Sequence, residues 1–301
     1  MKKLNYLLSK FTIILISVGL LTLFSSYTIQ RIDFDKGRFN NVCKNLKGEA
    51  LVYFVFVDSK ETAPWTEFDI RSTLDSMRVA VDWINAEARK SGIPLTMRTD
   101  YYIGEEHSTV SKNLPEGTVY KSAMNPNLEK GTANLNYWAD GIVKKVGGSL
   151  QMEEKDGIPD IKTPRNKERL VAYLRDKYSA ESVALLFMVN NYFRNDISLA
   201  LNTLGTEDVE FAIVSYKYPA EIAHSILSLY GAAPLYESTF RRDARKIAKA
   251  AEIFPNDIMQ DTYATPLLSR EVGALTQYLV GWSANLSKEY EPLLTDKIIR
   301  F

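Results

Sequence analysis

Two long apolar segments constrain the fold of this 301-residue chain more than any other feature. Residues 50–57 read A-L-V-Y-F-V-F-V and residues 183–189 read V-A-L-L-F-M-V, with no charged side chain in either. A strand that is apolar on both faces needs cover on both faces, as in sheets flanked by helices. The sequence therefore predicts an α/β (α+β) domain with a mixed sheet packed on long helices.

The segment that follows the first apolar run predicts a long helix and a second strand. Apolar residues recur at three to four residue spacing through residues 65–91, which gives one buried stripe. Gly92 and Pro94 are expected to end this helix. Residues 95–103 are rich in Thr and Tyr and alternate in polarity, so they predict a strand.

Shorter patterns predict the remaining elements. They are a helix at 136–146, a loop at 147–160, a helix with Thr163 as N-cap and Pro164 at its first position, a strand at 209–214 and a basic helix at 241–251. Ser269 is expected to cap the last long helix, whose apolar face contains Leu275, Tyr278, Leu279 and Trp282.

A helix between Pro219 and Gly231 is the centre of the functional argument. Proline suits the first turn of a helix because it lacks the N–H that would be unpaired there. Glycine suits the end because it adopts the left-handed cap conformation. The residues from Ile226 to Tyr236 form an apolar frame around this helix and the turn that follows it.

Residues 220–236, A-E-I-A-H-S-I-L-S-L-Y-G-A-A-P-L-Y, resemble the active-site helix of the zincin-type zinc metallopeptidases. The family motif has the form H-E-x-x-H-x-x-G-A-x-D-L-Y, in which the histidines bind zinc and the glutamate is the general base. Here His224 holds the first ligand position. Ser225 replaces the glutamate, Ser228 replaces the second histidine, and Pro234 stands where an acidic residue often completes the metal site.

A second segment strengthens the resemblance. Residues 254–259, F-P-N-D-I-M, are similar to the methionine-bearing turn that underlies the metal in related enzymes. The retained frame of the motif is Gly231, Ala232, Tyr236 and Met259. By order of elements the resemblance extends over residues 49–284, and it implies a zincin-like domain that is a degenerate member of the family.

The substituted residues are poorly suited to zinc chemistry. Catalytic zinc usually has three protein ligands and one open position for water. His224 alone does not provide this set, because the Ser228 hydroxyl stays protonated and Pro234 offers only a carbonyl oxygen. Ser225 does not act as a base, and general-base assistance is worth about a hundredfold or more. We therefore expect no catalytic residue and no cofactor.

Glu221 and Asp257 are the weak alternative metal ligands, and zinc is the expected cofactor only if they rebuild a site. Glu221 shares a helix face with His224. The simpler interpretation makes Glu221 a solvated carboxylate in the first helical turn, His224 a structural histidine and Asp257 a turn residue. His107 is expected in an exposed loop, and the basic run 241–246 on a solvated helix face.

The N-terminus predicts the compartment. Three lysines lie within the first ten residues, and an uncharged, largely apolar run covers residues 11–30. About 20 apolar residues span a bilayer, and a preceding basic flank favours an N-terminus inside the cell. We expect an anchor at 1–31, a spacer at 32–48 and an extracytoplasmic domain at 49–301. The alternative is a cleaved signal peptide, which makes the protein secreted or periplasmic.

The composition of the chain limits the classes of partner and of covalent cross-link that we expect. The formal net charge is zero, so no basic excess favours nucleic acid as a partner. The single cysteine, Cys43, excludes an intramolecular disulfide.

The expected function is that of a membrane-anchored, catalytically inactive metallopeptidase-like protein that binds a peptide or envelope protein, or acts as a scaffold. Two alternatives stay open: an active metal-dependent peptidase with an unorthodox metal site, and a structural envelope protein unrelated to peptidases. A helix at 219–230 facing a long sheet edge separates the last alternative from the others.

Overall fold

A computed structural model describes residues 46–60, 62–103, 109–113, 128–150, 166–190, 198–201, 210–215, 218–238, 241 and 243–294. All of these belong to one compact unit, residues 34–301. The expected anchor at 11–30 lies outside the described residues, as do Cys43, His107, Thr163 and Pro164. Within the described part, no helix combines the length and apolar character that a membrane crossing requires.

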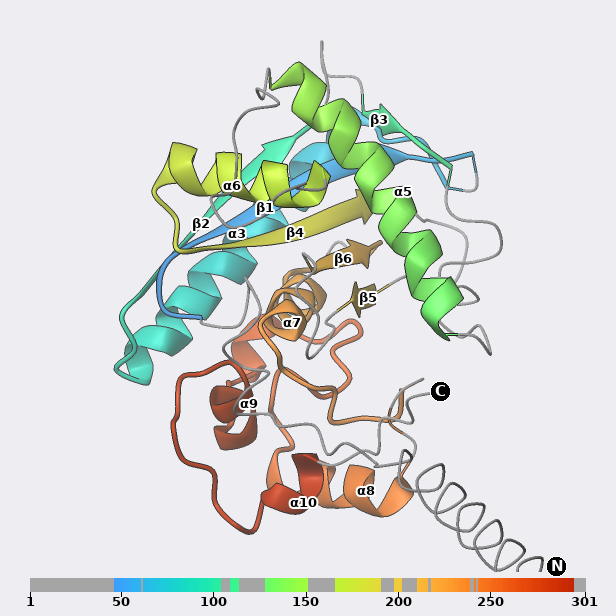
Figure 1. The fold of residues 1–301 in the computed structure, drawn as a ribbon. Coiled ribbons are helices and arrows are strands. Elements are labelled where there is room, and N and C mark those ends of the chain that lie inside the picture. Colours follow the sequence, from blue (N-terminus) through green and yellow to red (C-terminus); the bar gives the residue numbers. More distant parts are fainter. Residues whose placement is uncertain are drawn as a thin grey trace, which may run out of the picture. The chain divides into compact units, whose positions relative to one another are not determined.

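The described strands form one mixed sheet in the order β2-β1-β4-β6-β5, with β3 beside β1 (Figure 1). The strands are β1 (Gly48–Asp58), β2 (Leu95–Tyr102), β3 (Val110–Ser111), β4 (Ser182–Val189), β5 (Ser198–Leu201) and β6 (Phe211–Val214). All pairs are parallel except β5 with β6, which is antiparallel at one edge of the sheet. The predicted α/β fold with a mixed sheet is confirmed.

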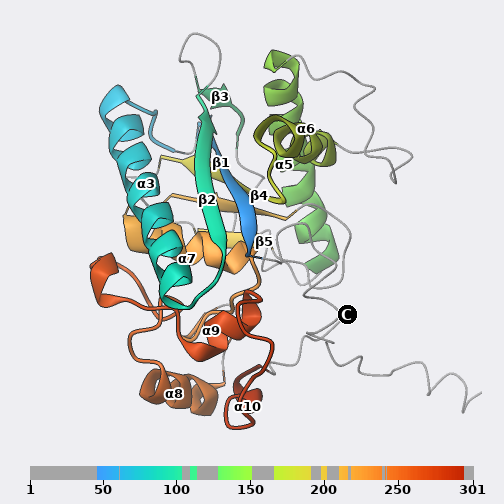
Figure 2. The same cartoon turned by 90° about the vertical axis from the view of Figure 1, so that its left-hand side faces the viewer.

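The two faces of β1 belong to two separate hydrophobic cores. Its residues 50, 52, 54 and 56 pack with α3 (Glu67–Lys90) and α7 (Pro219–Leu229), whereas residues 51, 53, 55 and 57 pack with α5 (Leu128–Ser149) and α6 (Asn166–Tyr178). Figure 2 shows α3 on one side of the sheet and α5 and α6 on the other. The continuous apolar run thus arises because both faces of the strand are covered.

Helix α3 starts and ends within two residues of its predicted bounds. Thr66 and Asp69 form a capping box, in which each side chain bonds the backbone N–H of the other. Ser91 caps the C-terminus, and Gly92 follows with a φ of 70°, a conformation that glycine adopts without steric cost. The Asn85 side chain bonds both the N–H and the carbonyl of Met97, which fixes β2 against the helix.

The C-terminal region packs on the side of α7 that faces away from the sheet. It contains α8 (Ala244–Ile253), the 3-10 turn η2 (Leu267–Ser269), α9 (Ala274–Leu279) and α10 (Glu291–Leu294). In Figures 1 and 2, α7 lies between the sheet and helices α8 to α10. The Trp282 indole Nε1 donates to the Leu46 carbonyl at 2.8 Å, which joins this region to the start of β1.

Several predicted bounds were wrong. The helix predicted at 136–146 is α5, which runs from 128 to 149 and includes the start of the predicted loop. Ser269 does not cap a long helix: it ends η2, and the six-residue α9 begins only after Gly273. The basic helix begins at 244 rather than 241, because the Asp243 side chain caps it by accepting the N–H groups of Arg245 and Lys246.

Candidate functional site

Helix α7 is enclosed between the sheet and the C-terminal region. Tyr218 is its N-cap and Pro219 its first residue, as predicted, and Gly231 follows its end with a φ of 99°. It packs against α3, β6 and β5, so the helix predicted at 219–230 is present beside the sheet. The edge that it faces is short rather than long, because β5 and β6 have four residues each. Nearly every residue of α7 is buried, because the helix is covered on several sides.

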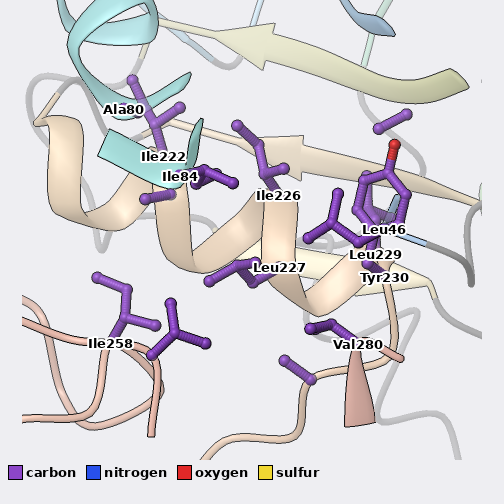
Figure 3. Packing of buried hydrophobic residues seen from close by; sticks show 14 of the residues in the cluster. Leu46, Ala80, Ile84, Ile222, Ile226, Leu227, Leu229, Tyr230, Ile258 and Val280 are labelled. Atoms are coloured by element: carbon purple, nitrogen blue, oxygen red, sulfur yellow. The ribbon is translucent and has the colours of Figure 1, made fainter. Parts of the chain in front are cut away.

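The apolar residues of α7 point to two sides, as Figure 3 shows. Ile222 and Ile226 lie towards Ala80 and Ile84 of α3, whereas Leu227 lies on the side of Ile258. Ile258 belongs to the segment predicted as the methionine-bearing turn. This packing holds residues 257–259 against α7.

His224 contacts that segment through a hydrogen bond. Its Nδ1 lies 3.0 Å from the Ile258 carbonyl oxygen, and its ring lies 5.9 Å from the Tyr236 ring, centroid to centroid. Burial lowers the pKa of His224 below its usual value of 6.5, since desolvation disfavours the charged ring. A neutral imidazole that donates from Nδ1 keeps an acceptor lone pair on Nε2.

The three substituted motif positions are all built into the local structure. The Ser228 hydroxyl donates to the His224 carbonyl at 2.9 Å, the usual back-bond of a helical serine. Ser225 is 1% exposed. The Pro234 carbonyl accepts Nη1 of Arg241 at 2.7 Å, and Arg241 also donates to the Leu293 carbonyl.

Arg241 corrects one expectation about the basic run 241–246. We expected a solvated helix face, but Arg241 precedes α8 and is only 3% exposed. Its guanidinium joins the turn after α7 to α10, because it donates to main-chain carbonyls in both. Arg245 and Lys246, within α8, do not share this buried environment.

Glu221 was expected to be solvated, and this was wrong. It is 3% exposed, and its Oε1 accepts the backbone N–H of Ala264 at 3.0 Å. The carboxylate therefore ties the first turn of α7 to a loop 43 positions later in the chain. Its local position in a first helical turn gave no sign of this contact.

Asp257 holds together the turn below His224. Its Oδ1 accepts the Met259 N–H at 2.7 Å, and its Oδ2 accepts the Gly273 N–H at 3.0 Å. The Thr276 hydroxyl lies 3.0 and 2.9 Å from the two carboxylate oxygens. Asp257 is fully buried, and burial raises its pKa to about 6 despite these bonds.

Backbone hydrogen bonds connect the turn after α7 with the segment predicted as the methionine-bearing turn. Leu235 donates its N–H to the Met259 carbonyl at 2.8 Å, so the turn after α7 runs beside the methionine segment. The Ala232 N–H bonds the Leu227 carbonyl at 3.0 Å, which completes the helix end beyond Gly231. Met259 is fully buried.

No family model, curated protein or solved structure matches this chain.

The donor groups near α7 do not assemble into a metal site within the described part of the chain. No group of three His, Cys, Asp or Glu side chains gathers there in a geometry that holds an ion. The weak candidates Glu221 and Asp257 use carboxylate oxygens to accept N–H and O–H groups instead. The arrangement presents one neutral imidazole beside an aromatic ring.

Sequence reasoning missed three contributors to the site. Thr276 and Gly273 bond Asp257 from the start of α9, and Arg241 bonds the carbonyl of Pro234. Gly273 is the N-cap of α9, a position that glycine tolerates, so it was the one local signal available. The buried Arg241 carried no local signal, because a run of basic residues is usually a solvated surface.

Proposed function

We propose that this chain is a degenerate, catalytically inactive member of the zincin-type metallopeptidases whose former active-site region serves binding or scaffolding at the cell envelope. The observation that best supports this proposal is the hydrogen bond between His224 and the Ile258 carbonyl. Metal-binding histidines typically donate their second ring N–H to a carbonyl or carboxylate in this way. His224 keeps this ligand-like arrangement while the other ligand positions hold residues that do not bind zinc.

The neighbouring residues support the loss of catalysis. The Ser228 hydroxyl is turned back onto the carbonyl of His224, and Pro234 engages Arg241 through its main chain. Neither residue supplies an anionic or imidazole ligand, and Ser225 supplies no carboxylate base. The apolar residues between Ile222 and Leu235 pack in one hydrophobic cluster.

Metal analysis of two proteins tests this proposal. The full-length chain and the variant Ser225→Glu/Ser228→His/Pro234→Asp are purified in detergent, exposed to zinc and desalted, and bound metal is quantified by mass spectrometry. We expect no stoichiometric zinc in the wild type and about one zinc per chain in the variant, because three protein ligands make a catalytic-type site. Adding His224→Gln to the variant should abolish its zinc uptake.

A second variant guards against misfolding. Ser225 is buried, so the larger glutamate strains its surroundings. Ser228→His/Pro234→Asp supplies the ligands without that change and should also take up zinc. Stoichiometric metal in the wild type, with chelator-sensitive peptide cleavage, supports the active-enzyme alternative instead. Absence of zinc from both folded variants rejects the family assignment and favours an unrelated envelope protein.

The membrane anchor is part of the same proposal. The lysines before residue 11 and the uncharged run at 11–30 support a single-pass anchor with the domain outside the cytoplasm. Alkaline extraction of membranes from expressing cells should leave the protein in the pellet. Protease added outside cells whose cytoplasmic membrane is intact should digest the domain. A soluble protein shortened at its N-terminus would support signal cleavage.

A further inference from the structure

We infer that Asp257 is a positioning residue for His224: it holds the Ile258 carbonyl on Nδ1 of the imidazole and thereby presents Nε2 as an acceptor for a hydrogen-bond donor of the bound partner. The inference rests on the proposed function, because the acceptor has a role only if this region binds a partner. It adds the chemical class of the group that the site receives.

One peptide group connects Asp257 to His224. The carbonyl of Ile258 and the N–H of Met259 belong to the same planar peptide unit and point in opposite directions. Asp257 Oδ1 accepts the N–H end at 2.7 Å, and His224 Nδ1 contacts the carbonyl end at 3.0 Å. Rotation of this peptide would break both bonds, so Asp257 sets the direction of the carbonyl.

Asp257 is itself fixed from the other side. Gly273 donates its N–H to Oδ2, and the Thr276 hydroxyl lies within hydrogen-bond distance of both oxygens. The carboxylate is fully buried and has no freedom to turn towards solvent. The start of α9 therefore orients Asp257, which orients the peptide below the histidine.

The same chain of contacts defines what the site accepts. With Nδ1 donating, the neutral ring keeps its lone pair on Nε2. The Ile258 carbonyl is on the Nδ1 side of the ring, and His224 is 8% exposed. We assign Nε2 as the ring atom that receives an N–H or O–H donor, such as a peptide amide.

Nitrogen NMR of histidine tests the inference directly. The chain has two histidines, so ¹⁵N-histidine labelling of a His107→Gln protein in detergent leaves signals from His224 alone. We expect a protonated Nδ1 and an unprotonated Nε2 near neutral pH. Asp257→Ala should convert this single tautomer into a mixture, whereas Asp257→Asn, whose amide oxygen still accepts the Met259 N–H, should restore much of it.

Thr276→Val is the matched control, because it removes a bond to Asp257 while leaving the Asp257–Met259 contact in place. It should destabilise the domain without changing the tautomer, which separates positioning from a loss of stability. A wild-type ring protonated at Nε2 overturns the inference, even if Asp257→Ala does not fold. Zinc uptake by the restored variants is independent of this readout, so the proposed function and the positioning role fail separately.

Discussion

The Trp282 indole and the Leu46 carbonyl form a hydrogen bond between residues 236 positions apart in the chain. Leu46 is fully buried and Trp282 is 6% exposed, so water does not replace the bond when it is lost. This contact holds the residues just before β1 against the segment that follows α9. The stability of the sheet and that of the C-terminal region are therefore linked.

Trp282→Phe should destabilise the protein by about 1–3 kcal/mol, because it leaves a buried carbonyl without its donor. Urea unfolding followed by circular dichroism measures the change. Tyr137→Phe is the control: Tyr137 is 78% exposed, and its variant should stay within about 0.5 kcal/mol of the wild type. Equal effects of the two changes would show that the indole bond contributes little.

Gly273→Ala should destabilise the protein, because a Cβ at this position would lie 2.5 Å from Asp257 Oδ2. We expect a loss of about 1–3 kcal/mol, typical of overpacking at a buried contact. Gly148→Ala in α5 is the matched comparison, since its Cβ meets nothing within 4 Å. That variant should gain about 0.5–1 kcal/mol from helix propensity, and thermal melts of both proteins give the comparison.

His224 should make the fold sensitive to acid. Its pKa is lowered by burial in the folded state, so the unfolded chain binds the proton more readily. The stability that His224 contributes is present above about pH 6.5 and is lost as the pH falls through the folded-state pKa. The stability difference between wild type and His224→Gln, measured in urea at several pH values, should shrink on acidification. A constant difference contradicts a buried neutral ring.

Asp257 should act in the opposite direction. Its pKa is raised from 3.8 to about 6, so the folded protein holds the proton more tightly than the unfolded chain. Its contribution is greatest below pH 3.8 and is lost as the pH rises through 6, a change on the order of 2–3 kcal/mol. The stability of wild type relative to Asp257→Asn should therefore fall between pH 4 and 6. A rise in this relative stability between pH 4 and 6 would contradict a raised pKa of Asp257 in the folded protein.

The elements with strong local signals were predictable from the sequence. The apolar runs of β1 and β4 required cover on both faces, and the helix stripe of α3 fixed its period. Pro219 and Gly231 marked the ends of α7 through backbone chemistry that acts within one turn. These features depend on residues that are close in sequence, so a single amino-acid sequence is enough to predict them.

The errors arose where distant segments decide the environment. Glu221 has the sequence context of a solvated carboxylate, and only the loop around Ala264 buries it. Strand β5 has four residues and gains its order from pairing with β6, so its own pattern was too short to find. Arg241 likewise depends on α10, which lies 52 positions away at Leu293. Local patterns carry no information about such cover.

Pro234 contacts Arg241 through its carbonyl oxygen, an atom that every amino acid possesses. Exchange of the side chain at this position leaves that contact available. This contact to Arg241 therefore places no requirement on whether the side chain at position 234 is acidic or apolar.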